Sequence, residues 1–293
     1  MLASAVALLA TPNDRQKGKL EEVAGFPDRQ VTGVAVSKDE RVFVSFPYWS
    51  DNHTISVGEV MRDGTLKPYP DEPWNAKSGD PAQRWVCVQS VYIDDQDTLW
   101  VLDPAAPKME KVVKGGAKLV RFDLTKNKVV HVIRFEEDFA PEGSYLNDVR
   151  IDTKTQHAYI TDSGLGALVI VDLKSGGKRR VLENHPATKA QPGVTLEVDE
   201  IQLKDPKTGQ TPQVHADGIA LDRENGYLYI HALTGHTLYR IKTTDLRDAG
   251  LSEEQLSQRV EKVADTPASD GMIAGRDGSI YLTTFEHNAI ARW

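Results

Sequence analysis

Residues 215–222 read HADGIALD, and residues 227–231 that follow read YLYIH. The first string opens with Asp217-Gly218 and continues as an apolar β run, and the aromatic Tyr229 comes 12 residues after Asp217. The same arrangement occurs five times, always with an aromatic 11 or 12 residues after the start of the signature. The signatures are TGVAV (32–36), QSVYI (89–93), NDVRI (147–151), DGIAL (217–221) and DGMIA (270–274), with the aromatics Phe43, Trp100, Tyr159, Tyr229 and Tyr281.

The spacing of the signatures indicates the fold class. Their starts lie 57, 58, 70 and 53 residues apart, which is enough for one four-stranded sheet in each unit. Such a sheet must stack on its neighbours to bury its faces, and radial stacking gives a β-propeller. The chain is therefore predicted to be an all-β propeller with five visible four-stranded blades, and residues 20–293 are predicted to form one domain.

The strands within a unit can be placed as well. In the second unit they are expected over residues 90–94, 98–102, 118–124 and 128–135. Polar turns such as DDQD (94–97) join the first two strands, because Asp, Asn and Gly suit tight hairpins. One helix is expected from Ser252, which can form a capping box with Gln255, to about Val260.

The two ends of the repeat region leave two alternatives for ring closure. Trp293 falls at the end of the third strand of the fifth unit, and residues 20–26 (LEEVAGF) have the character of a missing fourth strand. The chain is thus either a self-closed five-bladed propeller or a six-bladed propeller that lacks its C-terminal blade. Residues 183–214 form a long excursion before the fourth unit, with an extra strand possible at 195–203.

Composition excludes several classes of function. The net charge is −8 and no Lys/Arg cluster stands out, which argues against nucleic acid as a partner. Cys87 is the only cysteine, so an intrachain disulfide is excluded, and we interpret it as a buried structural thiol. The apolar start MLASAVALLA is too short to span a bilayer. Residues 1–19 are interpreted as a tail or a signal-peptide remnant, which implies a secreted or periplasmic protein.

The first residue of each signature should lie at a single point, the mouth of the central channel. These residues are Thr32, Gln89, Asn147, Asp217 and Asp270. The loops on the same face carry further candidates for contact with a small molecule, namely Tyr48, Trp49, Tyr145, His215, His236 and His287. Aromatic groups around a few polar ones are typical of a small-molecule site, although a solvated rim position is the alternative for the histidines.

Asn147, Asp217 and Asp270 offer hard oxygen ligands for a divalent cation. Calcium or magnesium prefers such ligands, and zinc could also use them. Because two carboxylates near one point repel, one of them should have a raised pKa when no cation is present. The structural alternative is that Asp and Asn before a strand only cap their own backbone. The motifs HExxH, CxxC, GxSxG and a phosphate-binding glycine loop are absent.

Several strings resemble a known family when taken together and in order. They are YLNDVRID (145–152), AYITDS (158–163), HADGIALD (215–222), YLYIH (227–231) and SDGMIAG (269–275). Over residues 31–293 the chain resembles the Yellow / major royal jelly protein family, and more distantly the gluconolactonase / regucalcin (senescence marker protein) family. Both resemblances imply six blades, which favours the six-bladed alternative and predicts an open seam.

The gluconolactonase resemblance also implies a divalent cation held by one Glu, two Asn and one Asp at the starts of inner strands. Asn147 and Asp270 match this pattern, while Asp217 stands in place of an Asn. Thr32 stands in place of the Glu, and its hydroxyl is a poorer ligand. By this resemblance, and because a base must reach the attacking water, Asp270 is the expected general base.

Three functions are therefore expected as alternatives. The first is hydrolysis of a lactone or ester that depends on a divalent cation, calcium before zinc or magnesium. The second is non-catalytic binding of a small cationic or aromatic ligand, with Tyr48 and Trp49 stacking on it. The third, rearrangement of oxidised catechols, is implied by the family resemblance alone.

Overall fold

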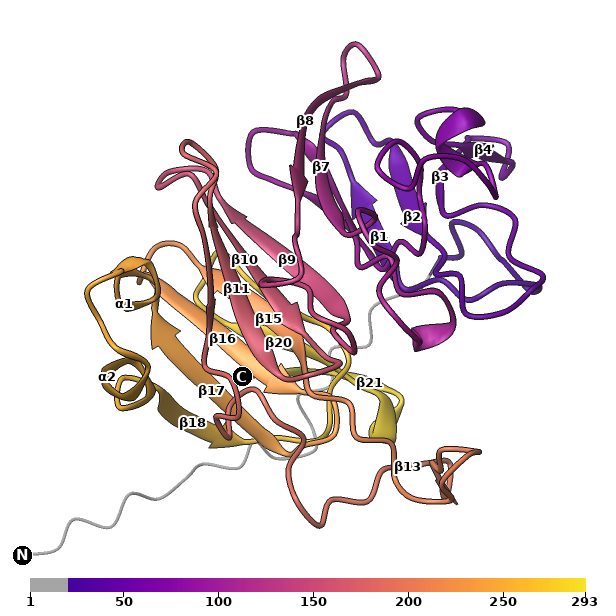
Figure 1. The fold of residues 1–293 in the computed structure, drawn as a ribbon. Helices are drawn as coiled ribbons and strands as arrows, with labels where there is room; N and C mark the ends of the chain where they lie inside the picture. Colours follow the sequence, from indigo (N-terminus) through magenta and orange to yellow (C-terminus); the bar gives the residue numbers. More distant parts are fainter. Residues whose placement is uncertain (1–20) are drawn as a thin grey trace, which may run out of the picture.

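The computed structural model describes residues 21–293, so the predicted tail at residues 1–19 lies outside the described residues. Five antiparallel β-sheets of the described chain follow one another in sequence as blades, and a sixth sheet of two strands lies between the third and fourth blades (Figure 1). The first four blades have four strands each, and the fifth blade has three strands among the described residues. Strands of neighbouring sheets contact each other in the order β1, β5, β9, β15 and β19. The predicted all-β propeller with five visible blades is confirmed.

The strands of each blade follow the chain outward from the central channel. The first blade consists of β1 (Gly33–Val36), β2 (Val42–Ser45), β3 (Val57–Val60) and β4 (Leu66–Pro68), and the second of β5 (Ser90–Ile93), β6 (Leu99–Asp103), β7 (Lys118–Asp123) and β8 (Lys128–Arg134). The third blade consists of β9 (Leu146–Asp152), β10 (His157–Asp162), β11 (Ala167–Asp172) and β12 (Lys178–Val181), and the fourth of β15 (Ala216–Asp222), β16 (Tyr227–Ala232), β17 (Thr237–Lys242) and β18 (Glu261–Asp265). The fifth blade consists of β19 (Met272–Ala274), β20 (Ile280–Thr284) and β21 (Ala289–Arg292). The strands of the second blade lie within one residue of their predicted bounds.

The hydrophobic core lies between the blades. Leu119 of the second blade and Val149 of the third belong to one buried cluster, and Leu168 and Ile219 join the third blade to the fourth. Trp85 and Trp100 are both buried, as expected for core residues. Alternate residues of each strand face opposite neighbours, so every sheet that lies between two others is buried on both faces.

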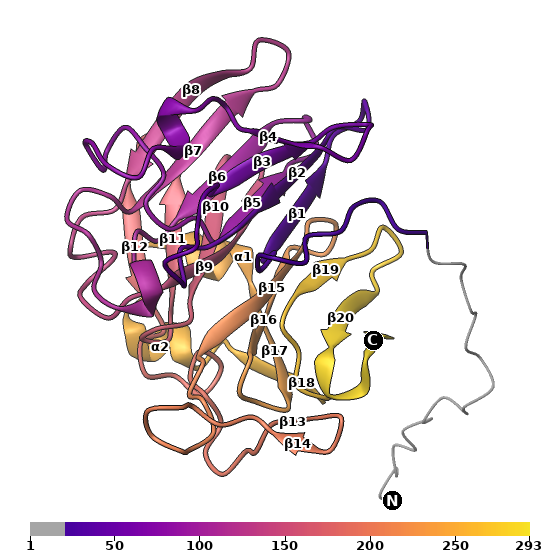
Figure 2. The same ribbon diagram turned by 90° about the vertical axis from the view of Figure 1, so that its right-hand side faces the viewer.

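The circle of blades is open between the first and fifth blades. The third signature position is buried in the second to fifth blades, where Val91, Val149, Ile219 and Met272 are 5% exposed or less. In the first blade the equivalent Val34 is 65% exposed, and on the fifth blade Ile273 and Ile290 are 59% and 73% exposed. Figure 2 shows β1 and β19 where the ring would close. This is the open seam that the six-bladed alternative predicts.

The N-terminal segment does not complete the fifth blade. Residues 21–26 form no strand, so the prediction of a fourth strand at 20–26 is wrong for its described part. Phe26 instead packs edge-on against Phe46, with ring centroids 5.2 Å apart, and this contact holds the segment beside the first blade. Val23 remains 72% exposed.

The helices and the excursion differ in detail from the sequence predictions. The capping box of Ser252 and Gln255 is present, but α2 (Glu253–Ser257) ends early because the chain must enter β18 at Glu261. A second short helix, α1 (Thr243–Arg247), was not predicted. The excursion carries a hairpin, β13 (Glu197–Val198) and β14 (Ile201–Gln202), in place of one strand.

The excursion reverses direction where Asp199 and Glu200 adopt positive φ angles of 51° and 66°.

Three single-turn 3-10 helices of the described chain lie in connections between strands, namely η1 (Pro73–Asn75), η2 (Pro107–Met109) and η3 (Phe285–His287). Over the described residues, 21–293, every helix is too short or too polar to cross a membrane.

Candidate small-molecule site at the channel mouth

The first residues of the five signatures line one cavity of about 400 Å³ in the central channel. The cavity is lined by all five of them, Thr32, Gln89, Asn147, Asp217 and Asp270. They come from five different blades, and each lies within two residues of the start of the innermost strand of its blade. We call these five residues the ring.

Hydroxyl groups of one blade hold the backbone of the ring residue on the next. Thr32 Oγ1 and Ser45 Oγ of the first blade both donate to the carbonyl oxygen of Gln89, at 2.7 and 3.0 Å. Thr161 Oγ1 of the third blade donates to the carbonyl oxygen of Asp217 at 2.9 Å. Thr32 therefore lines the cavity and donates its hydroxyl proton to the backbone of Gln89.

The two ring carboxylates have raised pKa values. Burial raises the pKa of Asp217 well above its ordinary value, the charges of Asp270 and Asp148 raise it further, and a hydrogen bond from Asn147 opposes them. Burial and the charge of Asp148 raise the pKa of Asp270, although this residue keeps an exposed surface. The raised pKa predicted for closely spaced carboxylates is thus present at both positions.

A single guanidinium partly balances these carboxylates. Arg150 pairs with Asp148 at 2.9 Å, lies over the ring of Tyr92, and donates from Nη2 to the carbonyl oxygen of Met272 at 2.6 Å. Among the described residues that line the cavity, the charged side chains are Asp148, Asp217, Asp270 and Arg150. Three carboxylates against one guanidinium leave the ionised cavity with two negative charges.

The ring fits the donor set that a hard cation takes. Two carboxylates and one amide offer oxygen ligands, as calcium and magnesium require. Within residues 21–293 no three His, Cys, Asp or Glu side chains converge as a metal-holding group. The set of Asn147, Asp217 and Asp270 differs from such a group because one of its three donors is the amide of Asn147.

The predicted aromatic contacts lie outside the cavity. Tyr48 stacks on His53, with ring centroids 5.0 Å apart, and lines a neighbouring smaller pocket. Tyr145 is buried and Trp49 packs beside it. Trp49 Nε1 donates to Tyr145 Oη at 2.8 Å, and Tyr145 Oη donates to Gln89 Oε1 at 2.9 Å. Trp49 and Tyr145 therefore reach the ring through Gln89.

The three predicted histidines are not among the described residues that line the cavity. His215 Nδ1 accepts from the Ala190 amide at 2.9 Å, and burial lowers the pKa of this imidazole. His236 Nε2 lies 3.0 Å from a carboxylate oxygen of Glu286. His287 is exposed in η3. His215 and His236 stand directly before β15 and β17, and His287 ends η3.

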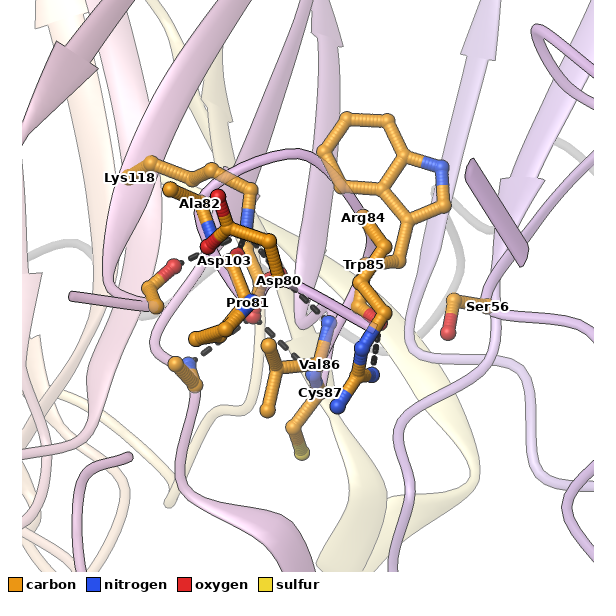
Figure 3. Close-up of polar contacts among 12 residues, drawn as sticks. Ser56, Asp80, Pro81, Ala82, Arg84, Trp85, Val86, Cys87, Asp103 and Lys118 are labelled. Carbon is orange, nitrogen blue, oxygen red and sulfur yellow. Dashed lines mark hydrogen bonds and ion pairs between the residues drawn. The ribbon is translucent and has the colours of Figure 1, made fainter. Parts of the chain in front are cut away.

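A buried ion pair that was not predicted from the sequence supports the segment leading to Gln89 (Figure 3). Asp103 and Lys118 have fully buried side chains, 2.9 Å apart. The Asp103 carboxylate also accepts from the backbone amides of Val86 and Cys87, at 2.8 and 3.0 Å. The segment that leads into Gln89 is thereby fixed on the end of β6.

The third blade repeats this support. Asp162 at the end of β10 accepts from the Tyr145 amide at 2.9 Å and pairs with Arg180 at 2.7 Å. A sequence signal exists, because Asp103 and Asp162 each stand three residues after the aromatic of their unit. Their basic partners come from strands at different places in the blade, β7 and β12, so the number of residues between each aspartate and its partner is not constant in the sequence.

A family comparison agrees with this repeat architecture. The model for the family described as "Major royal jelly protein" matches residues 86–293, which is more than half of the chain. The chain belongs to the major royal jelly protein family. A comparison of the chain with curated proteins found no match.

Solved structures share its fold at low identity. Hydrazine synthase of Kuenenia stuttgartiensis is 14% identical, with 90% of this chain and 83% of that chain covered and a TM-score of 0.52. A chain of a nidogen/laminin complex is 11% identical, with 92% and 78% covered and a TM-score of 0.53. A gluconolactonase of Xanthomonas campestris is 13% identical, with 90% and 75% covered and a TM-score of 0.50. At these identities the likeness concerns the fold alone.

Proposed function

We propose that the channel mouth binds a divalent cation on Asn147, Asp217 and Asp270, and that the cation supports hydrolysis of a lactone or ester. Calcium is the expected ion, with magnesium or zinc as alternatives. The observation that carries the proposal is that three carboxyl groups line one cavity with a single guanidinium, and that one of them, Asp217, is only 8% exposed.

The charge of the cavity favours a divalent occupant. Burying an ionised carboxylate without a partner is costly, and a buried group then shifts its pKa toward the neutral form. The raised pKa values of Asp217 and Asp270 show this effect. One divalent cation would balance the two charges that Arg150 leaves uncompensated, and would return both carboxyls to their ionised form.

The chemistry that such a cation supplies is polarisation of a carbonyl oxygen. Asp270 is the ring carboxylate that keeps an exposed surface, so water can reach it. An ionised carboxylate within hydrogen-bond reach of an attacking water can remove its proton. We assign Asp270 as the general base of the proposed hydrolysis.

Binding without catalysis is a second candidate, and the aromatic lining favours it. Tyr92 and Tyr281 line the same cavity as the carboxylates. Tyrosine faces next to acids suit a small organic cation such as an amine. The two candidates differ in whether the ring responds to a metal ion or to an organic cation.

The first test is calorimetric titration of calcium, and then zinc, into metal-free protein. Wild type should bind one ion saturably, and Asp270→Ala should lose this binding. Asp277→Ala is the matched control, because this aspartate lies in an exposed turn of the same blade. Equal binding by wild type and Asp270→Ala would exclude the ring as the cation site.

The second test follows if a cation binds. Lactones and nitrophenyl esters are then assayed with the saturated protein, and turnover should disappear in Asp270→Ala. A protein that binds the cation without turning over any of these substrates would contradict the hydrolase and favour the binding candidate, for which small amines are then titrated.

A further inference from the structure

We propose that Trp49 and Tyr145 are positioning residues, which fix the side-chain amide of Gln89 so that its NH₂ group faces the channel and donates to a carbonyl oxygen of the ligand. The catalytic consequence of this arrangement rests on the proposed hydrolase function. The orientation of the amide does not, because it follows from hydrogen bonding within the protein.

The direction of the hydrogen bonds determines the orientation. The indole N–H of Trp49 can only donate, so Tyr145 Oη is the acceptor of their 2.8 Å bond. The phenol has one proton, and it goes to Gln89 Oε1 at 2.9 Å. Cys87 Sγ lies 3.8 Å from Tyr145 Oη and is a weak partner. With its oxygen engaged, Gln89 has its two amide protons left for the cavity that it lines.

The neighbouring ring amide has the opposite orientation. Asn147 is hydrogen-bonded to the Asp217 carboxyl, and its Nδ2 group is the part of the amide that can donate to a carboxylate oxygen. The Asn147 oxygen is then free to face a cation. The mouth thus presents oxygen donors for a cation on one side and an N–H donor on the other.

A carbonyl compound suits this pair of features. A cation held by Asn147, Asp217 and Asp270 would draw electron density toward the carbonyl oxygen, and the Gln89 N–H could donate to the same oxygen. An ammonium group has no acceptor for this N–H. The arrangement therefore selects a lactone, ester or amide carbonyl over an amine.

The surroundings hold Gln89 firmly enough for such a role. Its backbone carbonyl accepts from Thr32 and Ser45, and its side chain accepts from Tyr145. Tyr145 comes from the third blade, where Asp162 holds its amide at 2.9 Å. The first and third blades thus both hold Gln89 of the second blade, whose side-chain amide lies at the channel.

The experiment compares Tyr145→Phe with Tyr159→Phe as the matched control. Both tyrosines are buried, and Tyr159 Oη accepts from Arg247 at 2.9 Å in a different part of the third blade. The probe is δ-valerolactam, a cyclic amide that offers a carbonyl oxygen, titrated by calorimetry with and without saturating calcium. Tyr145→Phe should weaken lactam binding roughly tenfold, while Tyr159→Phe leaves it unchanged and both keep the calcium affinity of wild type.

Two further variants keep the inference testable if Tyr145→Phe folds poorly. Trp49→Phe removes the indole donor and frees Tyr145 to rotate, so lactam binding should weaken in the same direction by a smaller factor. Gln89→Leu removes the donor outright and should weaken binding by about tenfold or more. If lactone turnover is found, Tyr145→Phe should lower kcat more than it raises KM, because a carbonyl oxygen gains charge in the transition state.

The outcomes separate this inference from the proposed function. Equal lactam affinity in wild type and Tyr145→Phe would overturn it, and so would a wild-type protein that does not bind the lactam. Lactam binding that depends on Tyr145 in a protein without calcium binding would support the positioning role and contradict only the metal-dependent hydrolase.

Discussion

Replacing Lys118 by Met should destabilise the protein more than any exposed charge change. The substitution keeps an unbranched side chain in the same space but removes the ammonium group. Lys118 Nζ donates to Asp103, to the Pro81 carbonyl and to the Gly116 carbonyl, at 2.9, 3.0 and 2.8 Å. All three acceptors lose this donor at once, and the Asp103 carboxylate stays buried without its counter-charge.

The magnitude follows from the burial of both partners. Removing one member of a buried ion pair costs about 3–5 kcal/mol of unfolding free energy. The Asp103 carboxylate keeps its bonds from the amides of Val86, Cys87 and Ala105, at 2.8, 3.0 and 2.9 Å. These bonds stabilise the unpaired charge, so we expect the lower end, about 3 kcal/mol. At an m value of about 3 kcal/mol/M, the urea midpoint falls by about 1 M.

The assay is urea unfolding followed by tryptophan fluorescence and circular dichroism, with Lys111→Met as the control. Lys111 pairs with Glu142 at 2.8 Å, but its side chain is 79% exposed. Exposed pairs contribute about 1 kcal/mol or less, so the control should move the midpoint by at most a few tenths of a molar. Equal midpoints for the two variants would refute the assignment of Lys118 and Asp103 as a buried supporting pair.

Three further predictions concern the ring and the seam. Thr32→Glu should tighten calcium binding by about tenfold in calorimetry, because it adds a carboxylate to the ring, and an unchanged affinity would place residue 32 outside the ion's reach. Asp217→Asn should raise the urea midpoint of metal-free protein at pH 7. A raised carboxyl pKa contributes stability at low pH that is lost as the pH rises from the ordinary value of 3.8 through the folded-state pKa, so the advantage should vanish in acid; a midpoint difference independent of pH would contradict this. Residues 1–293 should associate with rising concentration in sedimentation velocity, and Val34→Lys combined with Ile290→Lys should reduce the association; a wild-type monomer at all concentrations would show that the exposed seam is not adhesive.

The repeat made the fold predictable. Each unit carries its own signature, aromatic and turn, so five independent strings indicated the same sheet, and the strands of the second blade fell where expected. The fate of residues 21–26 was not predictable, because the contact of Phe26 with Phe46 depends on a partner in another part of the chain. The strand-like composition of that segment carried no information about this partner.

The ring was predictable for the same reason as the fold, since its members share one place in the repeat. The loop residues do not share a place in the repeat, and the directions of their side chains depend on local packing. Tyr48 stacks on His53, and Trp49 and Tyr145 bond to each other and to Gln89, outside the channel cavity. The supporting pair of Asp103 and Lys118 escaped notice because its members lie on different strands with no fixed spacing.

The hydroxyl bonds from one blade to the ring backbone of the next have a consequence for folding. Thr32 and Ser45 hold the Gln89 carbonyl, and Thr161 holds the Asp217 carbonyl, so these two carbonyl oxygens gain their hydroxyl partners only when adjacent blades have docked. The site is then a product of nearest-neighbour cooperativity along the repeat. Local unfolding of the first blade would release the Gln89 carbonyl on the second without unfolding the second blade itself. The Gln89 amide donates to the Leu102 carbonyl of its own blade at 3.1 Å, so native-state hydrogen exchange at Gln89 should follow the second blade even when the first blade opens.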